Sequence, residues 1–240
     1  MKVDAIKFSV DNESISENLF YPDKPNGLGV IFIHGWGSSQ KGYVERAGTV
    51  VKLGYYCLTF DLRGFGESEG EVSKLSLADH LDDVLAFYDF FKKNTKANKI
   101  CVCGTSYGGY LAARLLEQRA VYSIIMRAPG IYKDEIFKKT KWRQEKQLLE
   151  EINKFRGGGD FDNSAAIKNI KKFDGYLLVV GSEKDKIIPK RVVKAYYDSA
   201  IRVKKREIVW VKGADHALSS SKSQREYIKI LSSWFKKLPK

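Results

Sequence analysis

The feature that most constrains the fold is a serine enclosed by glycines at residues 104–109, which read Gly-Thr-Ser-Tyr-Gly-Gly. An apolar run precedes this segment, and a stretch with helical spacing follows it. Glycine two residues before and two residues after the serine removes side-chain clashes from a very tight strand-to-helix turn. We therefore predict a strained turn that lifts the Ser106 hydroxyl above the end of a strand, with a helix starting beneath it.

The composition is that of one globular domain spanning residues 1–240, of which 43% are hydrophobic. No apolar run approaches the ~18 residues of a membrane span, and the first residues lack a signal-peptide core. We therefore expect a cytoplasmic protein without a membrane span. The cysteines, Cys57, Cys101 and Cys103, lack the spacing of a disulfide framework or a zinc site, and we interpret them as small buried side chains.

The chain carries a formal net charge of +13, from 42 basic and 29 acidic residues. Such a surface attracts anions and favours nonspecific contact with nucleic acid or acidic membranes. The lysines are scattered, however, and no zinc-finger, helix-turn-helix or RNA-recognition pattern accompanies them. We predict a lysine-rich surface with no specific nucleic-acid partner. The oligomeric state stays open, with a homodimer as one alternative.

The predicted elements alternate between strand and helix after an opening antiparallel pair at Val3–Val10 and Ile15–Tyr21. Further strands are expected at 29–34, 55–60, 99–103, 121–127, 176–180 and 206–211. Helices are expected at 43–53, 75–94, 110–116, 191–200 and 224–237. This order predicts an α/β fold with a mostly parallel eight-stranded sheet and helices on both faces.

Several motifs follow these strands in a single order. His34-Gly-Trp-Gly follows the third strand, Asp61-Leu-Arg-Gly the fourth and the Ser106 turn the fifth, while Asp185 and His216 follow the last two. On these motifs the chain resembles the α/β-hydrolases over nearly its full length, and small carboxylesterases and feruloyl esterases in particular. The turn itself is similar to those of dienelactone hydrolases and prolyl oligopeptidases. The resemblance implies a serine hydrolase with a Ser-Asp-His triad.

Three histidines compete for the role of the base that a serine nucleophile needs. His34 lies in the turn expected to shape an oxyanion site. His80 lies in a predicted helix beside acidic residues, and we interpret it as a surface histidine. His216 follows the last strand, and ligands meet parallel sheets at the carboxyl ends of strands. The order Ser…Asp…His of the α/β-hydrolases also places the base at His216.

Three carboxylates compete for the acid that orients the imidazole. Asp185 follows the strand at 176–180 and matches the acid-bearing loop of the α/β-hydrolases. Glu183 is only two residues away and stays an alternative. Asp215 adjoins His216, but a neighbour in sequence does not easily reach the far ring nitrogen, so we interpret it as a residue that orders the loop.

The tetrahedral intermediate of such a reaction needs backbone N–H donors. One should be the N–H of Tyr107, directly after the nucleophile. The resemblance implies the N–H of Trp36 as the second donor, with Gly37 as the alternative. The side chains of Trp36 and Trp142 are our candidates for contact with substrate. By contrast, we interpret Asp61 and Arg63 as structural residues that brace the oxyanion loop.

The segment Ile131–Phe173 interrupts the alternation where α/β-hydrolases commonly insert a cap. We expect a charged helix at Asp134–Phe155, a glycine-rich hinge at 156–160 and a short helix at Ser164–Lys172. The segment is predicted to be a lid that shapes the pocket, and the alternative is a rigid connection. Its basic residues offer one way to attract anionic substrates, although an exposed helix needs no such purpose.

Together these features predict hydrolysis of carboxylic esters of small or medium acyl groups through an acyl-enzyme on Ser106, with no metal or organic cofactor. A thioesterase, a monoacylglycerol-lipase-like hydrolase and a small peptidase are alternative enzymes. An alternative from another class is a noncatalytic binding protein on the same fold. The small-molecule substrate itself stays unidentified at this stage.

Overall fold

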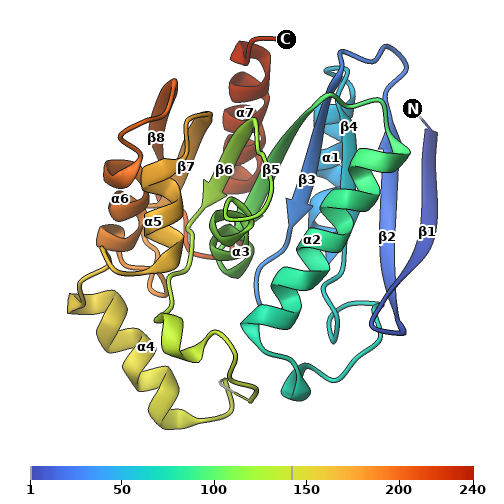
Figure 1. Ribbon diagram of the computed structural model, residues 1–240. Coiled ribbons are helices and arrows are strands. Elements are labelled where there is room, and N and C mark those ends of the chain that lie inside the picture. Colours follow the sequence, from blue (N-terminus) through green and yellow to red (C-terminus); the bar gives the residue numbers. More distant parts are fainter. Residues whose placement is uncertain (1, 142) are drawn as a thin grey trace.

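The computed structural model describes residues 2–141 and 143–240, and one eight-stranded sheet forms its centre (Figure 1). The strands are β1 (Lys2–Val10), β2 (Glu13–Tyr21), β3 (Leu28–Ile33), β4 (Tyr56–Phe60), β5 (Lys99–Thr105), β6 (Ser123–Arg127), β7 (Tyr176–Ser182) and β8 (Lys205–Val211). Their order across the sheet is β1-β2-β4-β3-β5-β6-β7-β8. Only the pairs β1–β2 and β2–β4 are antiparallel, so the predicted mostly parallel sheet is confirmed.

Helices follow the strands along the chain as the alternation predicts. They are α1 (Val44–Val51), α2 (Leu77–Asn94), α3 (Tyr107–Leu115), α4 (Lys146–Gly158), α5 (Ala165–Lys172), α6 (Lys190–Ser199) and α7 (Ser221–Lys237). Short 3₁₀ helices are η1 (Gln40–Tyr43), η2 (Val72–Lys74) and η3 (Asp134–Ile136). The helix α2 begins with a capping box, in which the Ser76 hydroxyl and the Asp79 carboxylate each bond the backbone N–H of the other.

The sheet is buried on both faces, which explains why its central strands read as unbroken apolar runs. Successive side chains point to opposite faces of a strand. Val30 and Phe32 therefore pack into the core beneath α1 and α7. Ile31 and Ile33 pack into the second core, beneath α2, α3, α5 and α6. Cys57, Cys101 and Cys103 are free and buried in the sheet, as the sequence predicts.

The parallel strands end at one edge of the sheet, at the bottom in Figure 1, and α4 lies beyond that edge. The predicted helix at Asp134–Phe155 is wrong. The described residues at the start of the segment form the 3₁₀ turn η3, and α4 begins at Lys146 and extends through Gly158, into the predicted hinge. Lys141 has a φ of 55°, a left-handed conformation that interrupts a right-handed helix. The second predicted helix is confirmed as α5.

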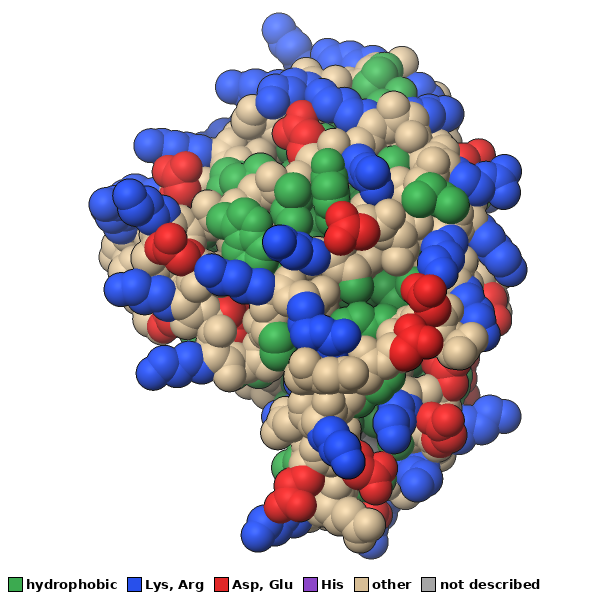
Figure 2. All heavy atoms as spheres, turned by 90° about the vertical axis from the view of Figure 1, so that its left-hand side faces the viewer, with side chains coloured by type: hydrophobic (Ala, Val, Ile, Leu, Met, Phe, Trp, Pro, Cys, Tyr) green, Lys and Arg blue, Asp and Glu red, His purple; other side chains and the backbone are tan. Residues whose placement is uncertain are grey.

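Basic side chains are spread over the face shown in Figure 2, with Asp and Glu side chains among them. This distribution agrees with the scattered lysines of the sequence. No helix in the described ranges combines the length and apolar character that crossing a bilayer requires. On this face the positive charge is therefore spread among acidic side chains and is not gathered in one basic patch.

Candidate active site

Ser106 occupies a strained turn between β5 and α3. Its φ of 52° and ψ of −113° are unusual for a residue with a side chain. The glycines around it are required by space: a Cβ on Gly104 would lie 2.2 Å from the carbonyl oxygen of Gly108, and a Cβ on Gly108 would lie 2.2 Å from that of Ile33. The strained turn predicted from the glycine spacing is therefore present, with α3 starting directly after the serine.

The structure brings Ser106, His216 and Asp185 together, although they come from three separate loops at the carboxyl edge. The Nε2 atom of His216 lies 3.1 Å from the Oγ atom of Ser106, and its Nδ1 atom lies 2.7 Å from Oδ2 of Asp185. Because an ionised carboxylate only accepts hydrogen bonds, this network assigns the ring proton to Nδ1 and leaves Nε2 as an acceptor for the serine hydroxyl. That is the arrangement a general base needs.

Asp185 is held in place and in its ionised form by its neighbours. Its side chain is 3% exposed, and its second oxygen accepts the backbone N–H groups of Ile187 at 2.8 Å and Ile188 at 2.9 Å. Burial alone would raise the pKa of this carboxyl, but the hydrogen bonds from His216 and from the two amides outweigh it and lower the pKa below 3.8. Asp185 therefore carries a negative charge against the imidazole at neutral pH.

The two competing carboxylates are occupied elsewhere. Glu183 accepts a hydrogen bond from the backbone N–H of Gly213 at 2.7 Å. Asp215 accepts from the backbone N–H and the hydroxyl of Ser219, so it orders the loop as expected. Neither carboxylate has a hydrogen bond or ion pair with His216, which favours Asp185 among the three candidates.

His80 is not a surface residue, and that interpretation is wrong. Its side chain is fully buried, with Nδ1 2.8 Å from the hydroxyl of Tyr107 and Nε2 3.1 Å from the carbonyl oxygen of Arg63. Burial lowers the pKa of this imidazole to about 4, so it is neutral at pH 7. His80 lies one helical turn from Leu77 and from Val84, both buried, and this spacing in the sequence already indicates the inner face of α2.

The loop after β3 is fixed to the rest of the edge by buried polar contacts. His34 accepts the backbone N–H of Leu62 at 2.9 Å through Nε2, and its Nδ1 lies 2.8 Å from the carbonyl oxygen of Gly35. Asp61 accepts the backbone N–H groups of Gln40 at 2.6 Å and Glu67 at 3.0 Å. These contacts agree with the bracing role that we assign to Asp61.

The residues predicted as oxyanion donors belong to two segments next to the serine: Trp36 lines the same cavity as Ser106, and Tyr107 directly follows Ser106. Gly35 lies so near the turn that a Cβ on it would meet the Cβ atom of Ser106 at 3.5 Å. Tyr107 is the first residue of α3, and its ring centroid lies 5.3 Å from that of Trp36, which is partly buried and also packs on Phe65. Trp142, the other candidate for contact with substrate, lies outside the described residues.

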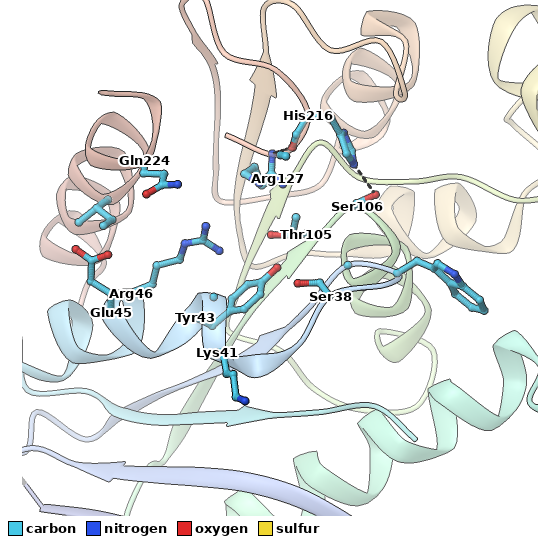
Figure 3. A pocket seen from close by; sticks show the side chains of 15 residues that line it. Ser38, Lys41, Tyr43, Glu45, Arg46, Thr105, Ser106, Arg127, His216 and Gln224 are labelled. Atoms are coloured by element: carbon cyan, nitrogen blue, oxygen red, sulfur yellow. Dashed lines mark hydrogen bonds between the residues drawn. The ribbon is translucent and has the colours of Figure 1, made fainter. Parts of the chain in front are cut away.

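A cavity of about 440 Å³ opens beside Ser106, on the side of the sheet covered by α1 and α7 (Figure 3). Its lining includes Tyr43, Arg46, Thr105, Ser106, Arg127 and His216.

Arg127 was not among the residues predicted from the sequence, and its Nη1 donates to the carbonyl oxygen of His216 at 2.7 Å. Burial lowers the pKa of its guanidinium from the usual value, yet arginine stays charged in proteins. Its position was a usable signal, because a charged residue at the end of the buried apolar strand β6 marks the functional edge of the sheet.

The parallel sheet with its antiparallel first strands and the Ser…Asp…His order at the carboxyl edge define an α/β-hydrolase fold. The protein family described as serine aminopeptidase, S33, matches residues 24–157, more than half of the chain. The chain therefore belongs to this family of α/β-hydrolases and is a serine hydrolase, which confirms the resemblance noted in the sequence.

Curated relatives are distant and longer. Lysophosphatidylserine lipase ABHD12 of Danio rerio is 24% identical over 185 residues, covering 73% of this chain and 48% of its own length. The quorum-quenching protein AidA of Acinetobacter baumannii is 30% identical over 108 residues, or 42% of this chain and 34% of AidA. The chain thus spans about half the length of the lipase and a third of the length of AidA.

Solved structures match nearly the whole chain. Est1E from Butyrivibrio proteoclasticus, determined with ferulic acid bound, has a TM-score of 0.75 at 17% identity and covers 97% of this chain and 98% of Est1E. The Pyrococcus furiosus esterase Pf2001 has a TM-score of 0.73 at 21% identity, covering 98% and 92%. At such low sequence identities the similarity shows a common fold and does not identify the substrate of this chain.

Proposed function

We propose that this serine hydrolase cleaves carboxylic esters of small or medium acyl groups through an acyl-enzyme on Ser106. The observation that supports this best is the continuous hydrogen-bonded relay from Ser106 through His216 to the ionised Asp185. The relay opens into a cavity large enough for a small ester. The similarity to a lysophosphatidylserine lipase and to esterases supports ester rather than amide substrates.

In the first half of the reaction, the Oγ atom of Ser106 attacks the carbonyl carbon while its proton passes to Nε2 of His216. The C=O electron pair moves onto oxygen, and the N–H groups of Trp36 and Tyr107 receive the resulting oxyanion. One such donor typically lowers the barrier by ~3 kcal/mol. Asp185 keeps the imidazole oriented and stabilises its positive charge, without itself taking the proton.

The tetrahedral intermediate then collapses, the bond to the leaving alcohol breaks, and His216 gives its Nε2 proton to the alcohol oxygen. A water molecule takes the place of the alcohol, loses a proton to His216 and attacks the acyl carbon. When this second intermediate collapses, the proton returns to Ser106 and the carboxylic acid leaves. His216 thus takes up and returns each proton that passes between Ser106, the leaving alcohol and the water.

The segment Ile131–Phe173 forms the lid over this site in our proposal. Support comes from Arg143, whose guanidinium lies 5.3 Å from the centre of the Trp36 ring. The base of the segment is fixed to the domain, because Arg191 on α6 donates to the carbonyl oxygens of Arg156 at 3.0 Å and Gly159 at 2.8 Å. Because Arg143 precedes α4 and its guanidinium lies near Trp36, we assign substrate selection to the loop before α4.

A fluorophosphonate probe, which reacts covalently with activated serines, tests the role of Ser106. We expect labelling of the wild type and none of Ser106→Ala. Ser9→Ala is the matched control, because Ser9 is an exposed serine on the edge strand β1. Folded wild-type protein that is not labelled would contradict the proposal and favour a noncatalytic binding protein.

A panel of 4-nitrophenyl esters and matched thioesters then tests the substrate class. We expect kcat/KM to be highest for short and medium acyl chains and higher for the oxygen ester than for the thioester of the same acid. Preference for the thioester would indicate a thioesterase. Preference for long-chain monoacylglycerols would instead indicate a lipase-like enzyme, the alternative that the similarity to ABHD12 favours.

A further inference from the structure

The cavity beside Ser106 contains buried polar atoms that lack a partner among the described residues. The Nε atom of Arg127 and the hydroxyl of Thr105 have no hydrogen bond, although both residues are only 4% exposed. A buried donor left unpaired costs free energy, so native proteins pair such groups with protein, water or a ligand. Both atoms belong to residues that line the cavity shared with Ser106 and His216.

The same cavity has an excess of positive charge. Arg46 extends into it from α1, and within the described part of the chain its guanidinium lies over two rings, 4.7 Å from the centre of the Tyr43 ring and 5.2 Å from that of Tyr227. Neither Arg46 nor Arg127 forms an ion pair with a carboxylate among the described residues. Lys41 also belongs to the lining, but its ammonium pairs with Glu67 at 3.0 Å, so the two arginines account for the excess, and Glu45 is the one acidic residue of the lining.

Two guanidinium groups around one space repel each other unless an anion lies between them. Figure 3 shows Arg46 and Arg127 extending toward this space, with the Thr105 side chain beside them. We propose that this pocket binds the anionic group, a phosphate or a carboxylate, of the ester that Ser106 attacks. The inference rests on the proposed function for the position of the ester, while the anion site follows from the pocket itself.

The chemistry of the pocket suits such a group. Guanidinium groups present N–H donors in a planar fork that matches phosphate and carboxylate oxygens, and the Thr105 hydroxyl supplies a further donor. The cavity of about 440 Å³ also reaches Ser106 and His216, so one molecule can occupy the anion site and the reactive serine together.

The exposed lysines of the lid explain the binding of an anion less well than the two arginines of the pocket do. Lys138, Lys139 and Lys141 are exposed, and their charges are screened by salt within about 8 Å in physiological solution. The charge of +13 on the whole chain acts on every anion alike. Recognition of one group at one place therefore has to come from the partly enclosed guanidinium groups.

Titration of the wild-type enzyme with inorganic phosphate, followed by isothermal calorimetry, tests the anion site without catalysis. We expect binding that Arg46→Gln weakens at least tenfold and that Thr105→Val weakens about threefold. Arg202→Gln is the matched control, because Arg202 is exposed in the turn before β8, at the amino end of that strand. It removes the same charge far from the cavity and should leave the affinity unchanged.

Matched esters test whether the anion belongs to the substrate. One pair compares an acylglycerol phosphate with the monoacylglycerol, and the other compares mono-4-nitrophenyl succinate with its neutral methyl ester. We expect the anionic member of at least one pair to be preferred tenfold or more in kcat/KM. The preferred pair shows whether a phosphate on the alcohol or a carboxylate on the acyl chain occupies the site, and Arg46→Gln should lower that preference about tenfold.

An enzyme that is labelled by the fluorophosphonate probe but neither binds phosphate nor prefers an anionic ester would overturn the inference. Equal losses of preference in Arg46→Gln and Arg202→Gln would also overturn it, because they would assign the effect to the general surface charge. Absence of probe labelling would instead contradict the proposed function. In that case, phosphate binding that is sensitive to Arg46→Gln would still support the anion site.

Discussion

Two buried arginines occupy opposite situations in this protein. Arg63, in the turn after β4, is 2% exposed and donates to the carboxylates of Asp83 at 2.6 Å and Asp11 at 2.8 Å, and to the carbonyl oxygen of Asp79 at 3.1 Å. Arg127, at the end of β6, is 4% exposed and has a single described hydrogen bond, to the carbonyl oxygen of His216.

The difference separates a structural charge from one available to a ligand. Around Arg63 the protein supplies the acceptors, and the network ties the β4 turn to α2 and to the β1–β2 hairpin. Around Arg127 it supplies one acceptor and a cavity. Burial alone does not distinguish the two arginines. The partners of their N–H groups do, because a buried charge without partners is costly and is retained where something else completes it.

The largest effect is expected from breaking the Arg63 network. Asp83→Ala leaves the Arg63 charge buried without its closest partner, and we expect the free energy of unfolding to fall by about 3–5 kcal/mol in urea denaturation. Asp89→Ala is the control, because Asp89 pairs with Arg119 at the surface and its side chain is 55% exposed. That loss should stay below about 1 kcal/mol. Similar losses in the two variants would contradict a structural role for the network.

A buried carboxyl group, Glu17, sharpens the comparison through its dependence on pH. Glu17 on β2 is 1% exposed, neither of its carboxyl oxygens has a described partner, and burial raises its pKa from 4.5 to about 8. The folded state therefore keeps a proton that the unfolded state releases above pH 4.5, so stability falls as the pH rises toward 8. We expect a loss of about 2–3 kcal/mol between pH 6 and pH 9 from this group.

Denaturation of Glu17→Met across the same pH range checks this expectation. The variant should lack the Glu17 contribution and be more stable than the wild type at pH 9. Glu151→Met, on the exposed side of α4, should keep the wild-type slope. A wild-type slope that survives Glu17→Met would show that other groups cause it.

Arg127→Lys tests the other arginine with a change that keeps the charge. Lysine lacks the planar fork, so the contact with the carbonyl oxygen of His216 should loosen and kcat for a neutral ester should fall about tenfold, or ~1.4 kcal/mol. The free energy of unfolding should change less than in Asp83→Ala. If Arg127→Lys lowered the free energy of unfolding but left kcat per folded molecule unchanged, Arg127 would have a structural role like that of Arg63.

The smallest effect concerns two threonines. The Thr105 hydroxyl has no described partner, whereas Thr59, which is also buried, donates to the side chain of Gln40 at 3.0 Å. We expect Thr105→Val to leave the melting temperature unchanged or slightly raised, and Thr59→Val to cost about 1 kcal/mol because a hydrogen bond is lost. An equal loss in both variants would show that Thr105 is satisfied in the unliganded protein.

Local patterns predicted much of this molecule because their causes are local. The glycines around Ser106 follow from the clashes of one turn, and the apolar runs follow from strands buried on both faces. The expected helix at Asp134–Phe155 failed because charged residues offered little apolar surface to hold it, and Lys141 adopts a left-handed conformation. The prediction for His80 was wrong because it relied on the acidic residues next to it in sequence. The spacing of His80 from Leu77 and Val84 places it instead on the buried face of α2.

The sequence by itself determined the sheet, the strained serine turn and the candidate acid and base, because each depends on the order of elements and on residues near one strand end. Only the tertiary structure decided which polar side chains line the cavity beside Ser106. Arg46, Thr105 and Arg127 come from α1, β5 and β6, and no spacing in the sequence predicts that they lie together. They meet because parallel strands end at one edge of the sheet and α1 packs beside that edge, and the charge of the pocket is the result.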